Sequence, residues 1–255
     1  MRMAITRQIS PRFNDCALTY LDRQPIDLAV ARTQHHEYEE ALRELGCEVI
    51  SLPAEPDLPD SVFVEDAALV FDEIAILTRP GADSRKPETE SVARALSPYR
   101  TICAIKAPGT LDGGDVLCVG KMVYIGLSSR SNAAAVEQTQ VYLAAYGYTV
   151  KGVKVTGCLH LKSAVTQVRA DTLLINPQWV DRSIFGTMRF IEVDEGEPPG
   201  ANAVWIGESV LYPSSFPKTQ RRLEEAGLHL KIVEASEVAK AEGAVTCCSL
   251  IFRQA

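Results

Sequence analysis

A helical segment followed by a short extended run recurs five times along the chain, and this repetition limits the possible folds more than any other feature. The copies span residues 32–53, 88–108, 132–155, 180–196 and 218–237. Three of them have a plain glycine at the helix end, at Gly46, Gly147 and Gly227, where a left-handed cap favours that residue. The fourth copy is weak as a helix. The chain is therefore built from repeated α/β units.

Each extended run is followed by a second recurring piece, an apolar strand pair with a turn between the strands. These pieces span residues 62–81, 111–126, 159–177 and 200–213, with a single strand at 247–255. The last piece lacks the second strand of its hairpin. We expect the N-terminal segment RMAITRQIS, residues 2–10, to supply that strand and to close a ring.

Equivalent points of the repeats are regularly spaced. They are Asp66, Asp115, Ser163, Asn202 and Cys248, which are separated by 49, 48, 39 and 46 residues. A period in this range is typical of repeated supersecondary units, none of which can bury its apolar face alone. The pattern predicts one α/β domain over residues 1–255, a closed five-unit ring with the helices outside. The alternative is a doubly wound α/β sheet, which explains the same alternation of helices and strands.

The composition argues against several classes of protein, including membrane-spanning, secreted and nucleic-acid-binding proteins. No run approaches the 18 or more apolar residues of a membrane span, and the N-terminus lacks the apolar stretch of a signal peptide. Seven cysteines without a C-x-x-C pair indicate reduced thiols, so we expect a cytoplasmic protein. A net charge of −7 without a Lys/Arg block argues against nucleic acid as a partner, and no glycine-rich nucleotide motif follows a strand.

Polar residues interrupt the apolar strands at one phase of the repeat. They are Glu65 and Asp66 in DSVFVEDAALVF, Asp112 and Asp115 in GTLDGGDVL, His160 in GCLHLKSAV, and Cys247 and Cys248 in AVTCCSL. Each taken alone has a structural explanation, such as a hydrogen-bonded core histidine or an Asp-Gly turn. In a ring, however, the inner strand ends converge, so the shared phase predicts a functional site on the central axis.

The residue types at this site indicate its chemistry. Buried carboxylates are costly unless they meet a cation, so several of them in one cavity favour a positively charged ligand. A thiol near a histidine, with a carboxylate to orient the imidazole, is the arrangement of nucleophilic catalysis. Together these features predict an enzyme that attacks a cationic carbon centre, and a guanidinium meets both requirements.

The chain resembles the dimethylarginine dimethylaminohydrolases, members of the guanidine-modifying (pentein) superfamily. The resemblance is carried, in order along nearly the whole chain, by LPDSVFVEDAALVF, LTRPGADSRKPE, LDGGDVL, YIGLSSRSN, LHLKS and TCCS. It implies a five-bladed ββαβ propeller with pseudo-fivefold symmetry. It also implies hydrolysis of Nω,Nω-dimethyl-L-arginine, or of the monomethyl compound, to L-citrulline and the methylated amine. No cofactor or metal is required, although a thiolate and an imidazole together would bind an inhibitory zinc.

The resemblance also assigns roles to individual residues. Cys247 matches the nucleophile, His160 the general acid and base, and Asp112 the carboxylate beside that histidine. Glu65 and Asp66 match the guanidinium-binding pair. The other implied substrate contacts are Asp60, Arg85 and Arg130 at the amino-acid end, Leu18 in a lid, and Ala241 and Glu242 at the α-amino group.

The implied reaction begins with attack of the Cys247 thiolate on the guanidinium carbon. His160 would protonate the departing amine, leaving a covalent thiouronium intermediate, and would then activate the water that releases citrulline. An ordinary thiol, with a pKa of about 8.5, needs activation at neutral pH. The cationic amino-acid substrate or a charged His160 would supply it.

Other functions remain open from the sequence. Arginine deiminases and amidinotransferases act on other guanidines with the same chemistry, and no motif encodes room for methyl groups. A non-catalytic propeller that only binds partners would need neither the thiol nor the histidine. The sequence also leaves open whether the chain acts as a monomer or a homodimer.

The adjacent cysteines are expected at the head of the closing strand, where neighbouring side chains point to opposite faces. The family resemblance assigns the chemistry to Cys247. It leaves Cys248 as a small residue that packs away from the substrate.

Overall fold

Five separate three-stranded sheets make up the β-structure of the computed structural model, which describes residues 1–254. In every sheet the first strand of the unit pairs antiparallel with the second, and the second pairs parallel with the third. The sheets are β15–β1–β2 (Leu250–Arg253, Arg2–Arg7, Cys47–Leu52), β3–β4–β5 (Ala68–Val70, Ile74–Leu77, Thr101–Ala104), β6–β7–β8 (Val116–Val119, Met122–Leu127, Thr149–Lys154), β9–β10–β11 (Val165–Arg169, Thr172–Ile175, Arg189–Glu192) and β12–β13–β14 (Val204–Ile206, Ser209–Pro213, His229–Val233). The alternative of one doubly wound sheet is therefore wrong for residues 1–254.

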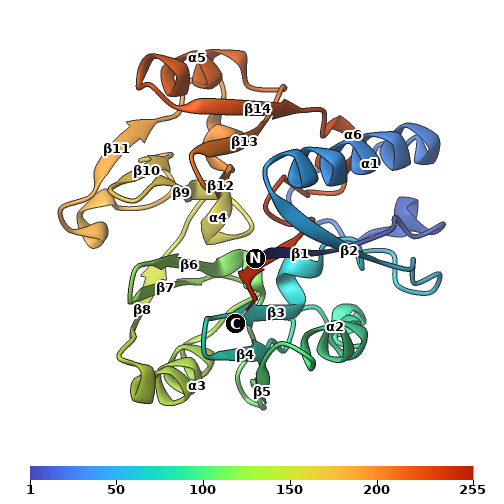
Figure 1. The fold of residues 1–255 in the computed structure, drawn as a ribbon, viewed down its shortest axis with the longest axis vertical. Coiled ribbons are helices and arrows are strands. Elements are labelled where there is room, and N and C mark those ends of the chain that lie inside the picture. The colour runs from blue at the N-terminus through green and yellow to red at the C-terminus, as the bar shows by residue number, and fades with distance from the viewer. Residues whose placement is uncertain (255) are drawn as a thin grey trace.

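One helix connects the second and third strands in four of the five units. These helices are α1 (Leu28–Glu44), α2 (Glu88–Leu96), α3 (Ala133–Leu143) and α5 (Pro217–Glu225), and Figure 1 shows them on the outside of the molecule. In the remaining unit the 3₁₀ helix η6 (Arg182–Phe185) takes this place, in agreement with its weak helical pattern. The expected caps at Gly46, Gly147 and Gly227 all have positive φ and are confirmed.

A short helical turn precedes the first strand of each sheet, at the equivalent points of the sequence repeat. These turns are η2 (Val64–Ala67), η4 (Gly113–Asp115), α4 (Leu161–Ala164), η7 (Pro198–Ala201) and the turn at 245–248. The other short helices are η1 (Phe13–Asp15), η3 (Asp83–Arg85), η5 (Ala144–Tyr146) and α6 (Ser236–Ala239). Because turns stand where strand ends were expected, the strict alternation of side chains between two faces does not apply there.

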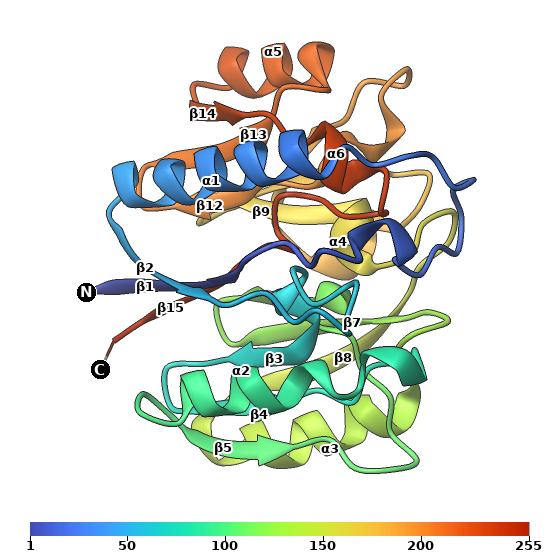
Figure 2. The ribbon, with the colours of Figure 1, turned by 90° about the vertical axis from the view of Figure 1, so that its right-hand side faces the viewer.

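The two ends of the chain meet in one sheet. Strand β1 pairs antiparallel with β15, in a register that sets Met3 opposite Phe252, and parallel with β2. Figure 2 shows both termini emerging side by side from the same edge of the molecule. The expectation that the N-terminal segment supplies the missing hairpin strand is confirmed; Ala255, at the end of the expected strand, lies outside the described residues.

The apolar core is divided among several clusters that join neighbouring units. In one of them, Ile5 of β1 and Phe252 of β15 pack with Val92 and Leu96 of α2. The helix of one unit therefore packs against the sheet of the next, and no unit buries its apolar face alone.

All seven cysteines lie among the described residues, and all are free thiols. No helix within residues 1–254 is both long enough and apolar enough to cross a membrane.

Candidate active site

A narrow pocket of about 20 Å³ contains most of the site residues expected from the sequence. The expected residues that line it are Asp60, Asp66, Arg85, Arg130, His160, Ala241, Glu242 and Cys247. Asp112 lies directly behind His160. Leu18 and Glu65, in contrast, are not among the lining residues. Eight of the eleven expected residues therefore meet in one place, and a ninth supports them.

The two cysteines lie in the turn at 245–248 and not on strand β15, so the expected strand position is wrong. The Cys247 N–H donates to the Ala244 carbonyl at 3.1 Å, and the Cys247 carbonyl accepts from the Glu65 N–H at 3.1 Å. These bonds fix the turn so that Cys247 lines the pocket. Cys248 packs into an apolar cluster with its Sγ 3.8 Å from the Ala244 carbonyl, as expected for the residue that faces away.

His160 and Asp112 form a buried pair. His160 Nε2 lies 3.1 Å from Asp112 Oδ2, and the Gly81 N–H donates to Asp112 Oδ1 at 2.9 Å. Burial opposes the charged imidazole, but Asp66, the hydrogen bond with Asp112 and the charge of Asp115 outweigh it. They raise the pKa of His160 to about 9, so this residue is a proton donor at neutral pH.

The two glycines of LDGGD allow this close approach. A Cβ on Gly113 would lie 1.9 Å from the Glu65 carbonyl oxygen, and one on Gly114 would lie 2.6 Å from His160 Nδ1. The Gly114 N–H also donates to Asp66 Oδ1 at 2.8 Å. The glycine pair is therefore needed because two neighbouring segments, residues 65–68 and His160, pack against its bare backbone.

Asp66 and Arg85 form a second buried pair in the pocket. Arg85 Nη1 donates to Asp66 Oδ2 at 2.6 Å, and Arg85 Nη2 donates to Glu88 Oε2 at 2.8 Å. Burial disfavours the Asp66 carboxylate, but the charges of His160 and Arg85 overcome it and lower the pKa of Asp66 to about 2. Burial prevails at Glu88, whose pKa rises to about 7. Asp66 is therefore an ionised acceptor inside the pocket.

A loop at 17–21 lies against the pocket and is held by acidic side chains. Glu242 Oε1 accepts the N–H groups of Thr19, Tyr20 and Leu21, and the Asp60 carboxylate accepts the Ala17 N–H at 3.2 Å. Arg130 also contacts this loop, because its Nη2 donates to Thr19 Oγ1 at 3.1 Å. Leu18 itself packs against an apolar cluster. The loop is thus held mainly by hydrogen bonds from its backbone N–H groups, and the Leu18 side chain makes none of them.

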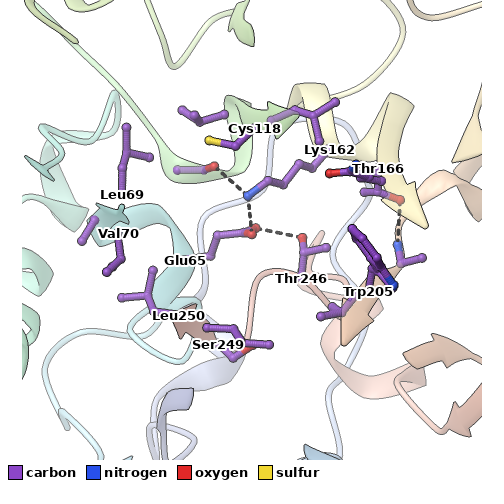
Figure 3. A pocket seen from close by; sticks show the side chains of 18 of the residues that line it. Glu65, Leu69, Val70, Cys118, Lys162, Thr166, Trp205, Thr246, Ser249 and Leu250 are labelled. Carbon is purple, nitrogen blue, oxygen red and sulfur yellow. Dashed lines mark hydrogen bonds and ion pairs between the residues drawn. The ribbon is translucent and has the colours of Figure 1, made fainter. Parts of the chain in front are cut away.

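Glu65 points to the opposite side of η2 from Asp66. It lines a separate channel, where its Oε1 accepts from Lys162 Nζ at 2.6 Å and its Oε2 from Thr246 Oγ1 at 2.8 Å, as Figure 3 shows. Of the expected guanidinium-binding pair, Asp66 lines the narrow pocket and Glu65 does not. The reason is the 3₁₀ turn, which sends two adjacent side chains to different cavities.

The surroundings of Cys247 favour the protonated thiol over the thiolate. Burial raises its pKa well above the ordinary value, and the carboxylates of Glu65 and Asp66 raise it further. The pocket therefore favours a neutral thiol at Cys247 and an imidazolium at His160. A cationic ligand next to the sulfur would favour the thiolate, whereas an anionic ligand would not.

The acidic groups also bear on metal binding. Oxygen atoms of Asp66 and Asp112 and a ring nitrogen of His160 lie within 4.8 Å of one another, a spacing that one metal ion could bridge. Asp66 is already paired with Arg85, and Asp112 is already bonded to His160. These ion pairs compensate the buried charge, and we assign no metal to the group.

Four lining residues were missed from the sequence: Ala17, Phe63, Leu159 and Gly243. They carry no reactive group, and the one available signal is that each lies within three residues of an expected one. Gly243 has a steric requirement that only the structure reveals, because a Cβ there would lie 2.2 Å from the Phe63 ring.

Comparisons with known proteins agree on one family. The sequence matches the family described as N,N dimethylarginine dimethylhydrolase, eukaryotic, over residues 18–181. It is 40% identical to an N(G),N(G)-dimethylarginine dimethylaminohydrolase of Streptomyces coelicolor, over 99% of this chain and 98% of the relative. A protein of the same name from Pseudomonas aeruginosa is 36% identical, over 89% of this chain and 90% of the relative.

The fold matches a solved structure of this family equally well. DDAH from Pseudomonas aeruginosa, as a cysteine-to-serine mutant complexed with citrulline, superposes with a TM-score of 0.94 at 34% identity. The match covers 98% of both chains. Sequence and fold therefore lead to the same relatives.

Proposed function

The chain belongs to the dimethylarginine dimethylaminohydrolase family, and on that premise we propose that its narrow pocket hydrolyses Nω,Nω-dimethyl-L-arginine to L-citrulline and dimethylamine. The monomethyl compound would yield citrulline and methylamine. The observation that carries this proposal is the convergence of Cys247, the His160–Asp112 pair and Asp66 on one small cavity. The protein is a hydrolase that acts on the C–N bond of a linear amidine.

We assign the chemical steps to Cys247 and His160. When the cationic substrate binds, the Cys247 thiol loses its proton to solvent, and the resulting thiolate attacks the guanidinium carbon and forms a C–S bond. The C–N bond to dimethylamine then breaks as the imidazolium of His160 donates its proton to the leaving nitrogen. Neutral His160 next takes a proton from water, and the resulting hydroxide attacks the thiouronium carbon. The C–S bond then breaks as the hydroxyl proton passes to the sulfur, which releases citrulline and restores the Cys247 thiol. Asp112 orients the imidazole throughout.

The substrate itself supplies the activation of the thiol in this scheme. A guanidinium about 4 Å from the sulfur contributes roughly 4 kcal/mol at an effective dielectric constant near 20, which corresponds to about three pKa units. Since the pKa of His160 is about 9, the proton needed by the leaving amine is already in place at neutral pH. Asp66 accepts the guanidinium N–H groups and so directs the carbon towards the sulfur.

The amino-acid end of the substrate would lie towards the latched loop. Arg85 and Arg130 would pair with its α-carboxylate, and Asp60, Ala241 and Glu242 would surround its α-amino group. A volume of about 20 Å³ is close to that of one water molecule, so the loop at 17–21 must open to admit the substrate. Leu18 then acts as part of this lid.

We also propose that the five sheets form a five-bladed propeller with pseudo-fivefold symmetry in a single domain. The supporting observation is the channel that Glu65 lines. It has a volume of about 310 Å³ and is lined by residues of β3, β6, β9, β12 and β15. These are the first strands of all five sheets, as expected if they surround a common axis. The active site would lie at one end of that axis.

The decisive experiment identifies the released amine. The protein is incubated separately with Nω,Nω-dimethyl-L-arginine and with arginine, and citrulline, dimethylamine and ammonia are quantified. We expect dimethylamine in equal amounts with citrulline and little reaction with arginine. Efficient release of ammonia from arginine would instead make the protein an arginine deiminase, and transfer of the amidino group to an added amine would make it an amidinotransferase.

A covalent intermediate provides a second test. Acid quenching during turnover should trap an adduct on the peptide that contains Cys247, detectable by mass spectrometry. If no adduct can be trapped and the protein only binds methylated arginines, the alternative of a non-catalytic binding propeller would stand. The seven free thiols favour a reducing compartment, so we place the reaction in the cytoplasm.

A further inference from the structure

The channel behind the active site ends in a floor of charged and polar side chains. Glu65, Lys162 and Thr246 lie there together, and Figure 3 shows them pointing towards one another from different elements. The Glu65 side chain is 9% exposed and that of Lys162 is 21% exposed. The ion pair is thus largely removed from solvent, so its charges are only weakly screened by water.

These side chains belong to a closed circuit of hydrogen bonds. Lys162 Nζ donates to Glu65 Oε1 at 2.6 Å, and Thr246 Oγ1 donates to Glu65 Oε2 at 2.8 Å. Asn202 Nδ2 donates both to Thr246 Oγ1 at 3.0 Å and to the Lys162 carbonyl at 3.1 Å, which completes the circuit. Lys162 Nζ also donates to the Gly113 carbonyl at 3.3 Å. The circuit therefore links the turns that precede all five sheets.

Four of these residues are next to, or two positions from, a residue of the active site. Glu65 precedes Asp66, Thr246 precedes Cys247, Gly113 follows Asp112, and Lys162 lies two positions after His160. The Glu65 N–H also donates to the Cys247 carbonyl at 3.1 Å, which holds the two turns together. The floor of the channel is therefore the rear wall of the catalytic pocket.

The Glu65 carboxylate is a potential obstacle to catalysis. A negative charge close to Cys247 disfavours the thiolate that the reaction requires. Within residues 1–254, the ion pair that Glu65 forms is with Lys162. Its ammonium therefore offsets the charge of Glu65 on the side of the wall that substrate does not reach.

We propose that Lys162 is a positioning residue for the reaction, which acts through Glu65 from the channel side to offset the negative charge behind the Cys247 sulfur. This inference rests on the proposed role of Cys247 as the nucleophile. Lys162 does not line the active-site pocket, so it exerts this influence without touching substrate.

The electrostatics agree with this geometry. Burial raises the pKa of Cys247, and Glu65 is the next cause. Burial alone would lower the pKa of Lys162, but Glu65 raises it, with a smaller contribution from Cys247 itself. The other titratable groups that influence Cys247 or share its pocket are Tyr38, Asp60, Asp66, Arg85, Arg130, His160, Glu242 and Cys248.

The inference is tested with two variants, one that removes the positive charge of Lys162 and one that removes the negative charge of Glu65. The rate of Cys247 carboxamidomethylation by iodoacetamide is measured against pH in the wild-type protein, Lys162→Met, Lys162→Arg, Glu65→Gln and the double variant with Glu65→Gln and Lys162→Met. Fragmentation of the C-terminal peptide separates modification of Cys247 from that of Cys248. Lys121→Met serves as the matched control, because Lys121 forms an exposed ion pair with Glu73 at 2.8 Å.

We expect the two single variants to shift the profile in opposite directions. Lys162→Met should raise the midpoint by about one pH unit and slow alkylation at pH 9 about tenfold, because the Glu65 charge is left unopposed. Glu65→Gln should lower the midpoint and accelerate alkylation, because Lys162 is left unopposed. The double variant, Lys162→Arg and Lys121→Met should all remain within about threefold of wild type.

Two outcomes would overturn the inference. If alkylation of the double variant is as slow as that of Lys162→Met, the lysine acts through packing and not through its charge. If neither single variant moves the midpoint of the pH profile, the charges of Glu65 and Lys162 have no effect on the Cys247 thiol. Since Glu65→Gln keeps an acceptor for Thr246, it reports on charge even if Lys162→Met is poorly folded. Alkylation needs no turnover, so failure of the proposed hydrolase activity would be recognised separately, by the released-amine assay.

Discussion

His160 Nε2 lies 3.1 Å from Asp112 Oδ2, and both side chains are almost completely buried. We therefore expect Asp112→Asn to lower the pKa of His160 from about 9 towards its ordinary value, because the amide cannot stabilise the imidazolium. Citrulline formation should fall by about a hundredfold or more. NMR titration of the His160 ring and the pH dependence of kcat measure both effects. An unchanged titration would show that Asp112 does not set the protonation state.

The same raised pKa makes the stability of the protein depend on pH. A group with a folded-state pKa of about 9 and an ordinary value of 6.5 stabilises the fold fully below pH 6.5, and this contribution is lost as pH rises through 9. The free energy of unfolding of the wild type should thus decline, relative to His160→Gln, by about 3 kcal/mol between pH 6 and 9.5. Urea unfolding at several pH values measures the difference. Parallel curves for the two proteins would contradict the raised pKa.

The neighbouring cysteines should respond differently to serine substitution. Cys247→Ser should reduce citrulline formation by about a thousandfold or more, since the pocket loses its proposed nucleophile. Cys248→Ser should retain most of kcat but lower the free energy of unfolding by about 1–3 kcal/mol, because it buries a hydroxyl in an apolar cluster. Steady-state kinetics and chemical unfolding of both variants test this pair. The reverse pattern would mean that Cys248 is the nucleophile.

Glu242 should control the lid. Glu242→Ala removes the acceptor for three consecutive N–H groups, so we expect a KM at least about tenfold higher and faster chymotrypsin cleavage near Tyr20, which is 57% exposed. Glu242→Gln retains an oxygen acceptor and should show a smaller change. If the alanine variant resists cleavage as well as the wild type does, Glu242 is not the latch.

Much of the fold could be predicted because its information is local or periodic. Apolar residues recur about every 3.6 positions in the helices and every two positions in the strands. Gly46, Gly147 and Gly227 mark three helix ends, and the repeat implies a closing partner for the last strand. The convergence of Asp66, His160 and Cys247 followed from their common phase in that repeat. These features need no knowledge of side-chain direction.

The orientation of the acidic residues could not be predicted in the same way. Glu65 and Asp66 are adjacent carboxylates in the sequence, and the 3₁₀ turn that separates them is stabilised by contacts with distant segments, such as the bond from the Glu65 N–H to the Cys247 carbonyl. The pairing of Arg85 with Asp66 and Glu88 likewise depends on tertiary packing. The charged groups of the site can therefore be predicted from the sequence, but their partners cannot.

The pairing of β1 with β15 has a consequence for how the protein is made. Residues about 250 positions apart must join in one sheet, which gives the chain contacts of very high sequence separation, and such contacts slow folding. Cys247 lies just before β15, so a chain synthesised only as far as residue 246 lacks both the proposed nucleophile and the closing strand. The pocket is therefore completed only after residue 253 has been synthesised, and shorter chains are expected to be inert towards methylated arginines.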